Sequence, residues 1–131
     1  LAVPRIEDSD IERLEAIQEA CEELLEEEDT DRLAVFRQDS RLHLTIAEIS
    51  GNRHLQDMLR RLDIQVMLCR MFLCRSIEKV GHDVEFHREI IAALSAGDAE
   101  KAENLIREHL HGAAALAKSP RGAEVGEETT A

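Results

Sequence analysis

The amino-acid sequence contains five successive segments in which apolar residues recur every three or four positions, the spacing that places side chains on one face of an α-helix. The expected helices cover residues 9–24, 30–50, 52–79, 83–96 and 98–117. The connections between them are short, and short connections between amphipathic helices favour antiparallel neighbours. The pattern therefore predicts an all-α protein built as an antiparallel helix bundle.

The expected helix boundaries rest on residues that typically begin or end a helix. Ser9 and Glu12 have the spacing of a capping box at the start of the first helix. The third helix is expected to run from Asn52 to about Lys79, because Gly81 should stop it. An amphipathic helix turns its apolar stripe to the core. In the third helix this stripe consists of Leu55, Met58, Leu59, Leu62, Val66, Cys69 and Leu73.

The composition supports one helical domain. The chain has 131 residues, of which 44% are apolar, which is enough for a core of normal size. It lacks Trp and Tyr, two residues that favour strands, so its composition favours helices. The domain is expected to cover residues 1–117. Residues 118–131 have no apolar periodicity and are expected to form a disordered tail.

The net charge of −12 argues against direct binding to nucleic acid, which requires clustered Lys and Arg. No segment has the length and apolar character of a membrane span or a signal peptide, so we expect a cytoplasmic protein without membrane contact. Cys21, Cys69 and Cys74 lack zinc-finger spacing and lie on or beside apolar stripes. They are expected to be buried thiols in a reducing compartment.

Four polar residues interrupt the apolar stripes. Asp39 and His43 lie one turn apart on the second helix, and His87 and His109 lie within the stripes of the fourth and fifth. Burying an unpaired carboxylate or imidazole is costly, so these groups need partners. Three imidazoles and a carboxylate suit a divalent first-row metal ion such as Zn, Ni, Mn or Fe. The same groups can instead bond to one another, and the spacing leaves both interpretations open.

Four short motifs follow one another along the chain: D-x-x-x-H at 39–43, A-E-I-S-G-N at 47–52, F-H-R-E-I-I-A-A-L-S-A-G-D at 86–98 and A-x-x-x-I-x-x-H-L at 102–110. Together with the helix boundaries, they resemble the ligand-sensing C-terminal domain of FadR-type regulators in the GntR transcription-factor family. The similarity extends from about Pro4 to Ala117. It implies a bundle of the FadR C-terminal domain type.

The resemblance also implies a ligand set. In the metal-containing members of that family, one Asp and three His hold a divalent ion. By motif position, these ligands correspond here to Asp39, His43, His87 and His109. The ion helps to bind a small organic acid, often a hydroxy-, keto- or sugar acid. Arg70, Arg75 and Asn52 are candidates for a second contact with that acid. Alternatively, these arginines are exposed or pair with acidic residues.

The resemblance implies that the protein acts as a homodimer. It also implies that DNA is bound by an N-terminal winged helix-turn-helix domain, which is usually followed by a further sensor helix. Neither is visible in this sequence, so DNA binding is expected to depend on the missing domain. Two alternatives remain at this point: a metal-dependent enzyme acting on small organic acids, and a metal-free helical interaction module. An enzyme is disfavoured because no H-E-x-x-H motif supplies a general base beside the histidines.

Overall fold

The structure, a computed structural model, describes residues 6–73 and 77–118. Five helices follow one another: α1 (Asp8–Glu26), α2 (Arg32–Ile49), α3 (Arg53–Leu73), α4 (Ile77–Ser95) and α5 (Ala99–Lys118). No strand occurs within the described ranges. The all-α prediction is therefore confirmed. The predicted tail lies, apart from Lys118, outside the described residues.

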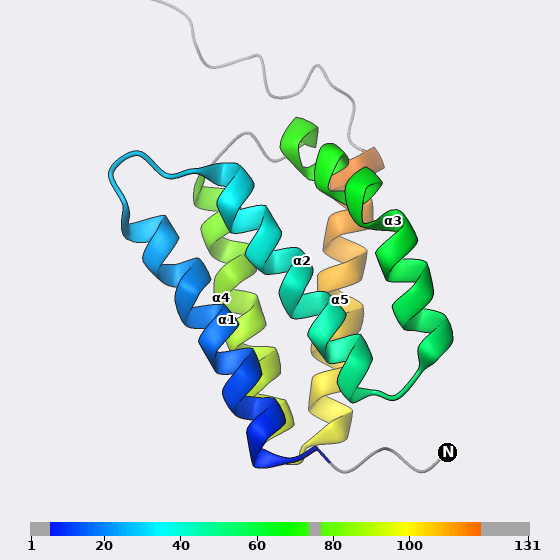
Figure 1. Cartoon of the computed structure of the whole chain (residues 1–131). Coiled ribbons are helices and arrows are strands. Elements are labelled where there is room, and N and C mark those ends of the chain that lie inside the picture. The colour runs from blue at the N-terminus through cyan, green and yellow to red at the C-terminus, as the bar shows by residue number, and fades with distance from the viewer. Residues whose placement is uncertain (1–5, 74–76, 119–131) are drawn as a thin grey trace, which may run out of the picture.

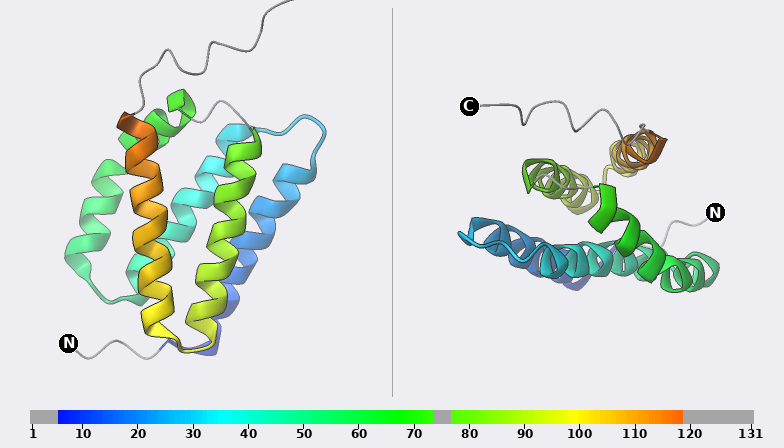
Figure 2. Two further views of the ribbon diagram at one scale, coloured as in Figure 1. Left: turned by 180° about the vertical axis from the view of Figure 1, so that it is seen from behind. Right: turned by 90° about the horizontal axis from the view of Figure 1, so that it is seen from above.

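The helices form an antiparallel bundle of two layers (Figure 1). Helices α1, α2 and α3 form one layer, and α4 and α5 form the other (Figure 2). Helix α1 packs against both α2 and α4, and α4 packs against α5. Helix α3 packs mainly against α2 and makes few contacts with α5. None of the described helices is long and apolar enough to cross a membrane.

The core lies between α1, α2 and α4. One cluster of buried residues consists of Cys21, Val35, Phe36, Val80 and Val84. A second cluster consists of Leu14, Ile17, Leu42 and Ile91. These stripes agree with the helical periodicity of the sequence, and Cys21, only 1% exposed, is confirmed as a buried thiol.

Two helix starts differ from the sequence prediction. The capping box of α1 is formed by Glu7 and Asp10, whose side chains accept from each other's backbone N–H groups, so the prediction of Ser9 and Glu12 was wrong. The helix begins before Ser9, which places Glu7 at the N-cap. Helix α2 is capped by Asp31, which accepts hydrogen bonds from the backbone of the first turn.

The predicted long helix to Lys79 was also wrong. Helix α3 ends at Leu73, and α4 begins at Ile77 and continues through Gly81. A glycine ends a helix when it adopts the left-handed conformation. Gly51 and Gly97 do so, with φ of 70°, but Gly81 does not. Gly81 is simply a helical residue beside open space.

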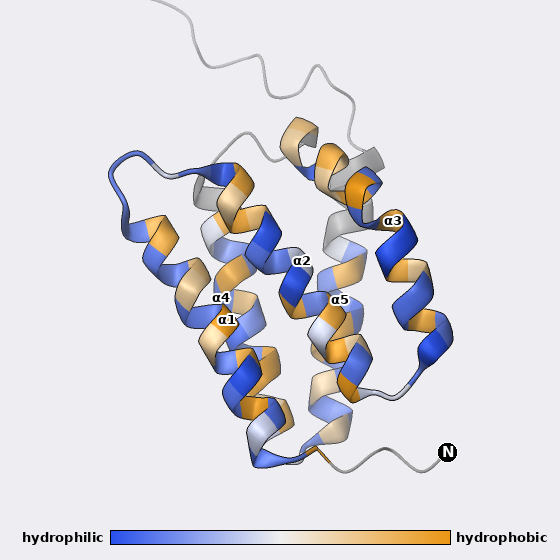
Figure 3. Cartoon of the chain, in the orientation of Figure 1, coloured by the Kyte–Doolittle hydropathy of each residue, from blue (hydrophilic) through white to orange (hydrophobic). Residues whose placement is uncertain are grey.

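The apolar stripe of α3 that the sequence assigned to the core mostly faces away from the core (orange segments of α3 in Figure 3). Leu62 and Val66 are 45% and 42% exposed, and Cys69 is exposed rather than buried. The half-buried apolar side of α3 instead carries Met67 and Met71, which pack against the first core cluster. The predictions of a core-facing stripe and of a buried Cys69 were wrong because periodicity identifies an apolar face without identifying what covers it. Cys74 lies outside the described residues.

Candidate metal centre

Three histidines from three helices meet inside the bundle. His43 comes from α2, His87 from α4 and His109 from α5. The Nε2 atom of His87 lies 3.2 Å from that of His43 and 3.0 Å from that of His109. Each imidazole offers one ligand atom, and these atoms all lie within 4.8 Å of one another. The structure thus brings together all three histidines that the sequence singled out.

The turn between α4 and α5 explains why His87 and His109 meet. Gly97 adopts φ of 70°, and the N–H groups of Gly97 and Asp98 donate to carbonyls in the last turn of α4. Asp98 then caps α5 by accepting from Lys101 N. The chain reverses here, and the two histidines lie at similar distances from the turn. They therefore face each other across antiparallel helices.

Hydrogen bonding alone cannot satisfy the three rings. A ring nitrogen carries either one N–H or one lone pair, so His87 Nε2 can make a good hydrogen bond to one of its two neighbours but not to both. Two nitrogens bound at right angles to one ion at about 2.1 Å lie ~3.0 Å apart. The observed separations of 3.2 and 3.0 Å are close to that value. The three histidines are therefore candidate ligands of a metal ion.

Burial keeps the three imidazoles neutral. Desolvation lowers the pKa of His43 to about 4 and that of His109 to about 4. The pKa of His87 falls to about 2 because of burial first, and then because His43, His109 and Arg70 lie nearby. Neutral imidazole is the form that binds a metal ion. The cluster is therefore in its ligating form at neutral pH.

Asp39 lies against the other side of two of these rings. Its Oδ2 atom is 3.5 Å from Nδ1 of His43, and its Oδ1 atom is 3.4 Å from Nδ1 of His87. These contacts are longer than good hydrogen bonds. The Asp39 side chain is 4% exposed and also contacts the guanidinium of Arg70 on α3. In this arrangement Asp39 lies beside the Nδ1 atoms of His43 and His87, whereas the Nε2 atoms of these rings lie next to one another.

The comparison with protein families agrees with this architecture. The sequence profile of the FCD domain matches residues 1–112. The chain belongs to the FCD domain family. FCD domains are ligand-sensing regulatory domains of GntR-type transcription factors rather than a family of enzymes. The predicted family is thereby confirmed. No curated protein matches the sequence.

Arg70 and Asn52, two of the residues predicted to contact an organic acid, lie in different parts of the FCD domain. Arg70 reaches the candidate centre through Asp39. Asn52 is exposed, and its side chain accepts a hydrogen bond from Leu55 N at the start of α3. About 18 positions, or ~27 Å of helix, separate it from Arg70, so one small acid does not span both. Arg75 lies outside the described residues.

Two further residues of the FCD domain lie at the centre and were missed by the sequence interpretation. The charge of Asp83 acts on both His43 and His109 and raises their pKa against the effect of burial. The ring of Phe86 stacks on His109 with centroids 5.6 Å apart and an angle of 21° between the planes. Asp83 precedes His87 by four positions, as Asp39 precedes His43. That repeated D-x-x-x-H spacing was the available signal.

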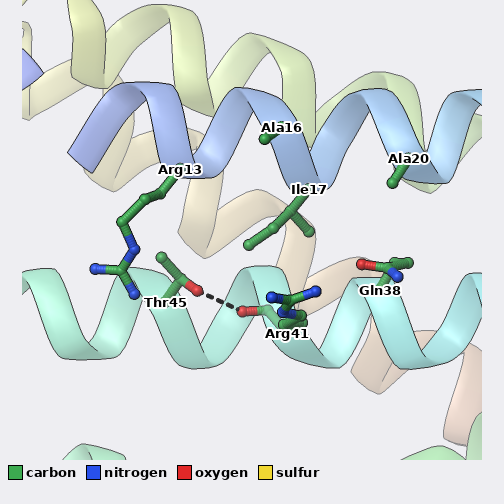
Figure 4. Close-up of a pocket in the computed structure, with 7 residues that line it drawn as sticks. All are labelled: Arg13, Ala16, Ile17, Ala20, Gln38, Arg41 and Thr45. Atoms are coloured by element: carbon green, nitrogen blue, oxygen red, sulfur yellow. Dashed lines mark hydrogen bonds between the residues drawn. The ribbon is translucent and has the colours of Figure 1, made fainter. Parts of the chain in front are cut away.

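A shallow groove of about 260 Å³ lies elsewhere on the FCD domain, between α1 and α2 (Figure 4). It is lined by Arg13, Ala16, Ile17, Ala20, Gln38, Arg41 and Thr45. Arg13 forms an ion pair with Glu48 at 3.0 Å. None of the three clustered histidines lines this groove, so it is separate from the candidate metal centre.

Proposed function

We propose that this FCD domain is the metal-dependent sensor of a small organic acid in a cytoplasmic GntR-type regulator. A divalent first-row ion, Zn, Ni, Mn or Fe, is held by His43, His87 and His109. The convergence of their three Nε2 atoms supports this role, because neutral imidazoles packed at 3.0 and 3.2 Å without a shared cation leave a nitrogen poorly satisfied.

Asp39 is the proposed fourth member of the set. The family resemblance makes it a direct ligand, whereas the observed contacts with Nδ1 of His43 and His87 suit a carboxylate that orients the ligating rings. Both roles require its negative charge beside the ion. Replacing Asp39 is therefore expected to weaken metal binding in either case.

The acid is proposed to bind where the ion and Arg70 meet. Four protein ligands leave positions open on a six-coordinate ion, and a hydroxy-, keto- or sugar acid can occupy two of them. The side chain of Arg70 is 18% exposed, and its guanidinium already binds a carboxylate, that of Asp39. Its planar fork suits a second carboxylate. Arg75 remains a candidate without structural support.

As a regulator, the domain would act as a homodimer and control DNA binding by a winged helix-turn-helix domain outside this sequence. The acid can shift the conformation only if it binds two arrangements of the helices with different affinities. We propose that this difference in affinity arises because the acid replaces Asp39 as the partner of Arg70. This exchange would alter the contact between α2 and α3.

The acid-binding role is tested by calorimetric titration of metal-loaded and EDTA-treated protein with a 2-hydroxy acid, a 2-keto acid and a sugar acid. We expect at least one acid to bind, and only to the loaded protein. Arg70→Gln should weaken binding by about 10- to 100-fold, the value of a charge-assisted hydrogen bond. Arg107→Gln is the matched control, since Arg107 pairs with Glu103 on the surface of α5.

Equal acid binding with and without metal would contradict the proposal, as would an Arg107→Gln effect as large as that of Arg70→Gln. Because Asp39 is buried, Arg70→Gln leaves its carboxylate without the guanidinium, and folding of the variant must be checked by circular dichroism. Arg70→Lys, which keeps the charge but loses the planar fork, provides a second measurement. It should bind the acid with intermediate affinity.

A further inference from the structure

Asp83 brings a second carboxylate to the candidate metal centre. Burial lowers the pKa of His43 and His109, and the nearby charge of Asp83 acts against this effect. Asp83 is half-buried, and no described residue donates a hydrogen bond to its side chain or forms an ion pair with it. A carboxylate that is partly withdrawn from water needs a hydrogen-bond donor. A bound ligand can supply one.

The directions of the helices fix where Asp83 lies relative to the histidines. Helices α2 and α4 run in the same direction (Figure 1). Asp39 precedes His43 by one turn on α2, and Asp83 precedes His87 by one turn on α4. Both aspartates therefore lie on the same side of the histidines, toward the N-terminal ends of the two helices. Arg70 lies on this side as well, because its guanidinium contacts Asp39.

Arg70 and Asp83 bring opposite charges to this side of the centre. Beyond the effects of burial and of the other histidines, Arg70 lowers the pKa of His87 and His109. Asp83 instead acts on His43 and His109. The two charges therefore approach the histidines from different directions. An acid held between them can turn its carboxylate to Arg70 and a hydrogen-bond donor to Asp83.

The substituent next to the carboxylate decides whether an acid can satisfy Asp83. A 2-substituted acid can bind an ion through one carboxylate oxygen and through the oxygen or nitrogen on the neighbouring carbon. A hydroxyl or amino group at that carbon also carries a hydrogen that it can donate to a carboxylate, whereas a keto oxygen only accepts. Beside Asp83, a keto oxygen would face another acceptor, and its binding would be weaker.

The charge at the centre favours an acid with a single carboxylate. A divalent ion and Arg70 supply three positive charges, and Asp39 and Asp83 remove two of them, so one remains while the histidines are neutral. One carboxylate neutralises this charge. A second carboxylate would leave an excess negative charge close to Asp83, at a site partly withdrawn from water.

We propose that Asp83 determines which acid the centre accepts, namely a monocarboxylate that carries a hydroxyl or an amino group on the carbon beside the carboxylate. Asp83 accepts a hydrogen bond from that group, while Arg70 binds the carboxylate. This inference rests on the proposed function, because it specifies the acid that the metal-dependent sensor binds. Asp83 thus acts on specificity, outside the set of proposed metal ligands.

Calorimetric titration of protein loaded with Zn or Ni, and freed of excess metal, tests the inference. The probes share one carbon chain: 2-hydroxybutanoate, 2-aminobutanoate, 2-oxobutanoate and the dicarboxylate 2-hydroxybutanedioate. The hydroxy or the amino acid should bind at least about tenfold more tightly than the keto acid and the dicarboxylate, the value of one charge-assisted hydrogen bond. The affinities of the first two acids show which donor Asp83 prefers.

Asp83→Asn should reduce the preference for the donor-bearing acid over the keto acid by about tenfold, because an amide can donate as well as accept. It should also bind 2-hydroxybutanedioate more tightly than the wild type does, since one negative charge is gone. Glu85→Gln, which changes an exposed carboxylate on the same helix, should keep the wild-type order of affinities. The metal content of each loaded protein is measured first, so that a lost ion is not mistaken for altered specificity.

Two results would overturn the inference and leave the proposed sensor intact. One is a wild type that binds the keto acid or the dicarboxylate as tightly as the hydroxy and amino acids. The other is an Asp83→Asn variant with the same relative affinities as the wild type. If the loaded wild type binds none of the probes, the inference is wrong, and if it also fails to bind a sugar acid, the proposed function is wrong with it.

Discussion

The Nε2 atom of His87 lies 3.0 Å from the Nε2 atom of His109, inside a bundle where His87 is only 1% exposed. Two neutral imidazoles at this distance share at most one proton, and His43 approaches the same atom of His87 from the other side. The Nδ1 atom of His87 is buried and finds no hydrogen-bond partner within the described part of the chain. Without an ion, we expect the buried His87 to lower the stability of the fold.

His87→Leu is expected to separate stability from metal binding. In the metal-free protein the variant should unfold at a denaturant concentration equal to or above that of the wild type, because an apolar side chain replaces a poorly satisfied polar one. Metal at 100 times its dissociation constant should stabilise the wild type by about 2.7 kcal/mol and the variant by nothing. Urea titrations with EDTA and with Zn, Ni or Mn measure both effects.

Leu42→Ala is the control for this pair of measurements. Leu42 is 1% exposed in the second core cluster, so its truncation should cost about 2–5 kcal/mol while metal stabilisation persists. A metal-free His87→Leu protein that is strongly destabilised would show that His87 is already well satisfied by its neighbours.

Metal-free protein should lose stability as the pH falls below 6.5. Above this value the three histidines are neutral in both the folded and the unfolded chain, and they add no pH dependence. Below it the unfolded chain takes up protons that the folded chain refuses, since folding lowers the pKa of His43 and His109 to about 4 and that of His87 to about 2. The free energy of unfolding therefore declines from pH 6.5 to about 4 for two histidines and further for His87.

Urea midpoints measured with EDTA between pH 8 and 4 test this prediction. The His87→Leu variant should show a shallower decline than the wild type, because one of the three groups is gone. The same slope in both proteins would mean that burial of His87 does not control its protonation.

Asp83→Asn should weaken metal binding by about tenfold, the lower end of the effect of groups just outside a metal's ligand shell. Asp83 lies close enough to His43 and His109 to raise their pKa, so its charge should also attract a cation held between them. Competition with a chelating dye gives the dissociation constant. Glu85→Gln removes an exposed carboxylate from the same helix and should have no effect. A similar loss in both variants would indicate only a change in net charge.

The sequence was sufficient to predict the helices and the polar cluster, for a physical reason. Helical periodicity indicates directly which side chains share a face. It therefore identified three polar residues within apolar stripes: His43, His87 and His109. Polar residues in a core need one another or an ion, so three such residues on three packed helices are expected to meet in one cluster. The FCD family match agrees with that interpretation.

The remaining features depended on information that periodicity does not contain. The sequence predicts a helix stop at Gly81 because the φ angle of a glycine cannot be read from a sequence, so the fourth helix was expected to begin only at residue 83 and Asp83 was not recognised as a neighbour of the histidines. The α3 stripe was assigned to the core although Leu62 and Val66 face the solvent. An apolar face shows that burial is needed, but it does not tell whether the same chain or a second copy provides it.

The most direct test of the account is the metal content per chain, measured by plasma mass spectrometry on protein purified without an affinity metal. The wild type should carry about one first-row ion per chain, and His87→Ala and His109→Ala should carry none. His111→Ala, which changes an exposed histidine two positions from His109 on α5, should keep the ion. A wild-type protein without metal, even after incubation with Zn, Ni and Mn, would contradict the account and leave the three histidines as a hydrogen-bonded cluster.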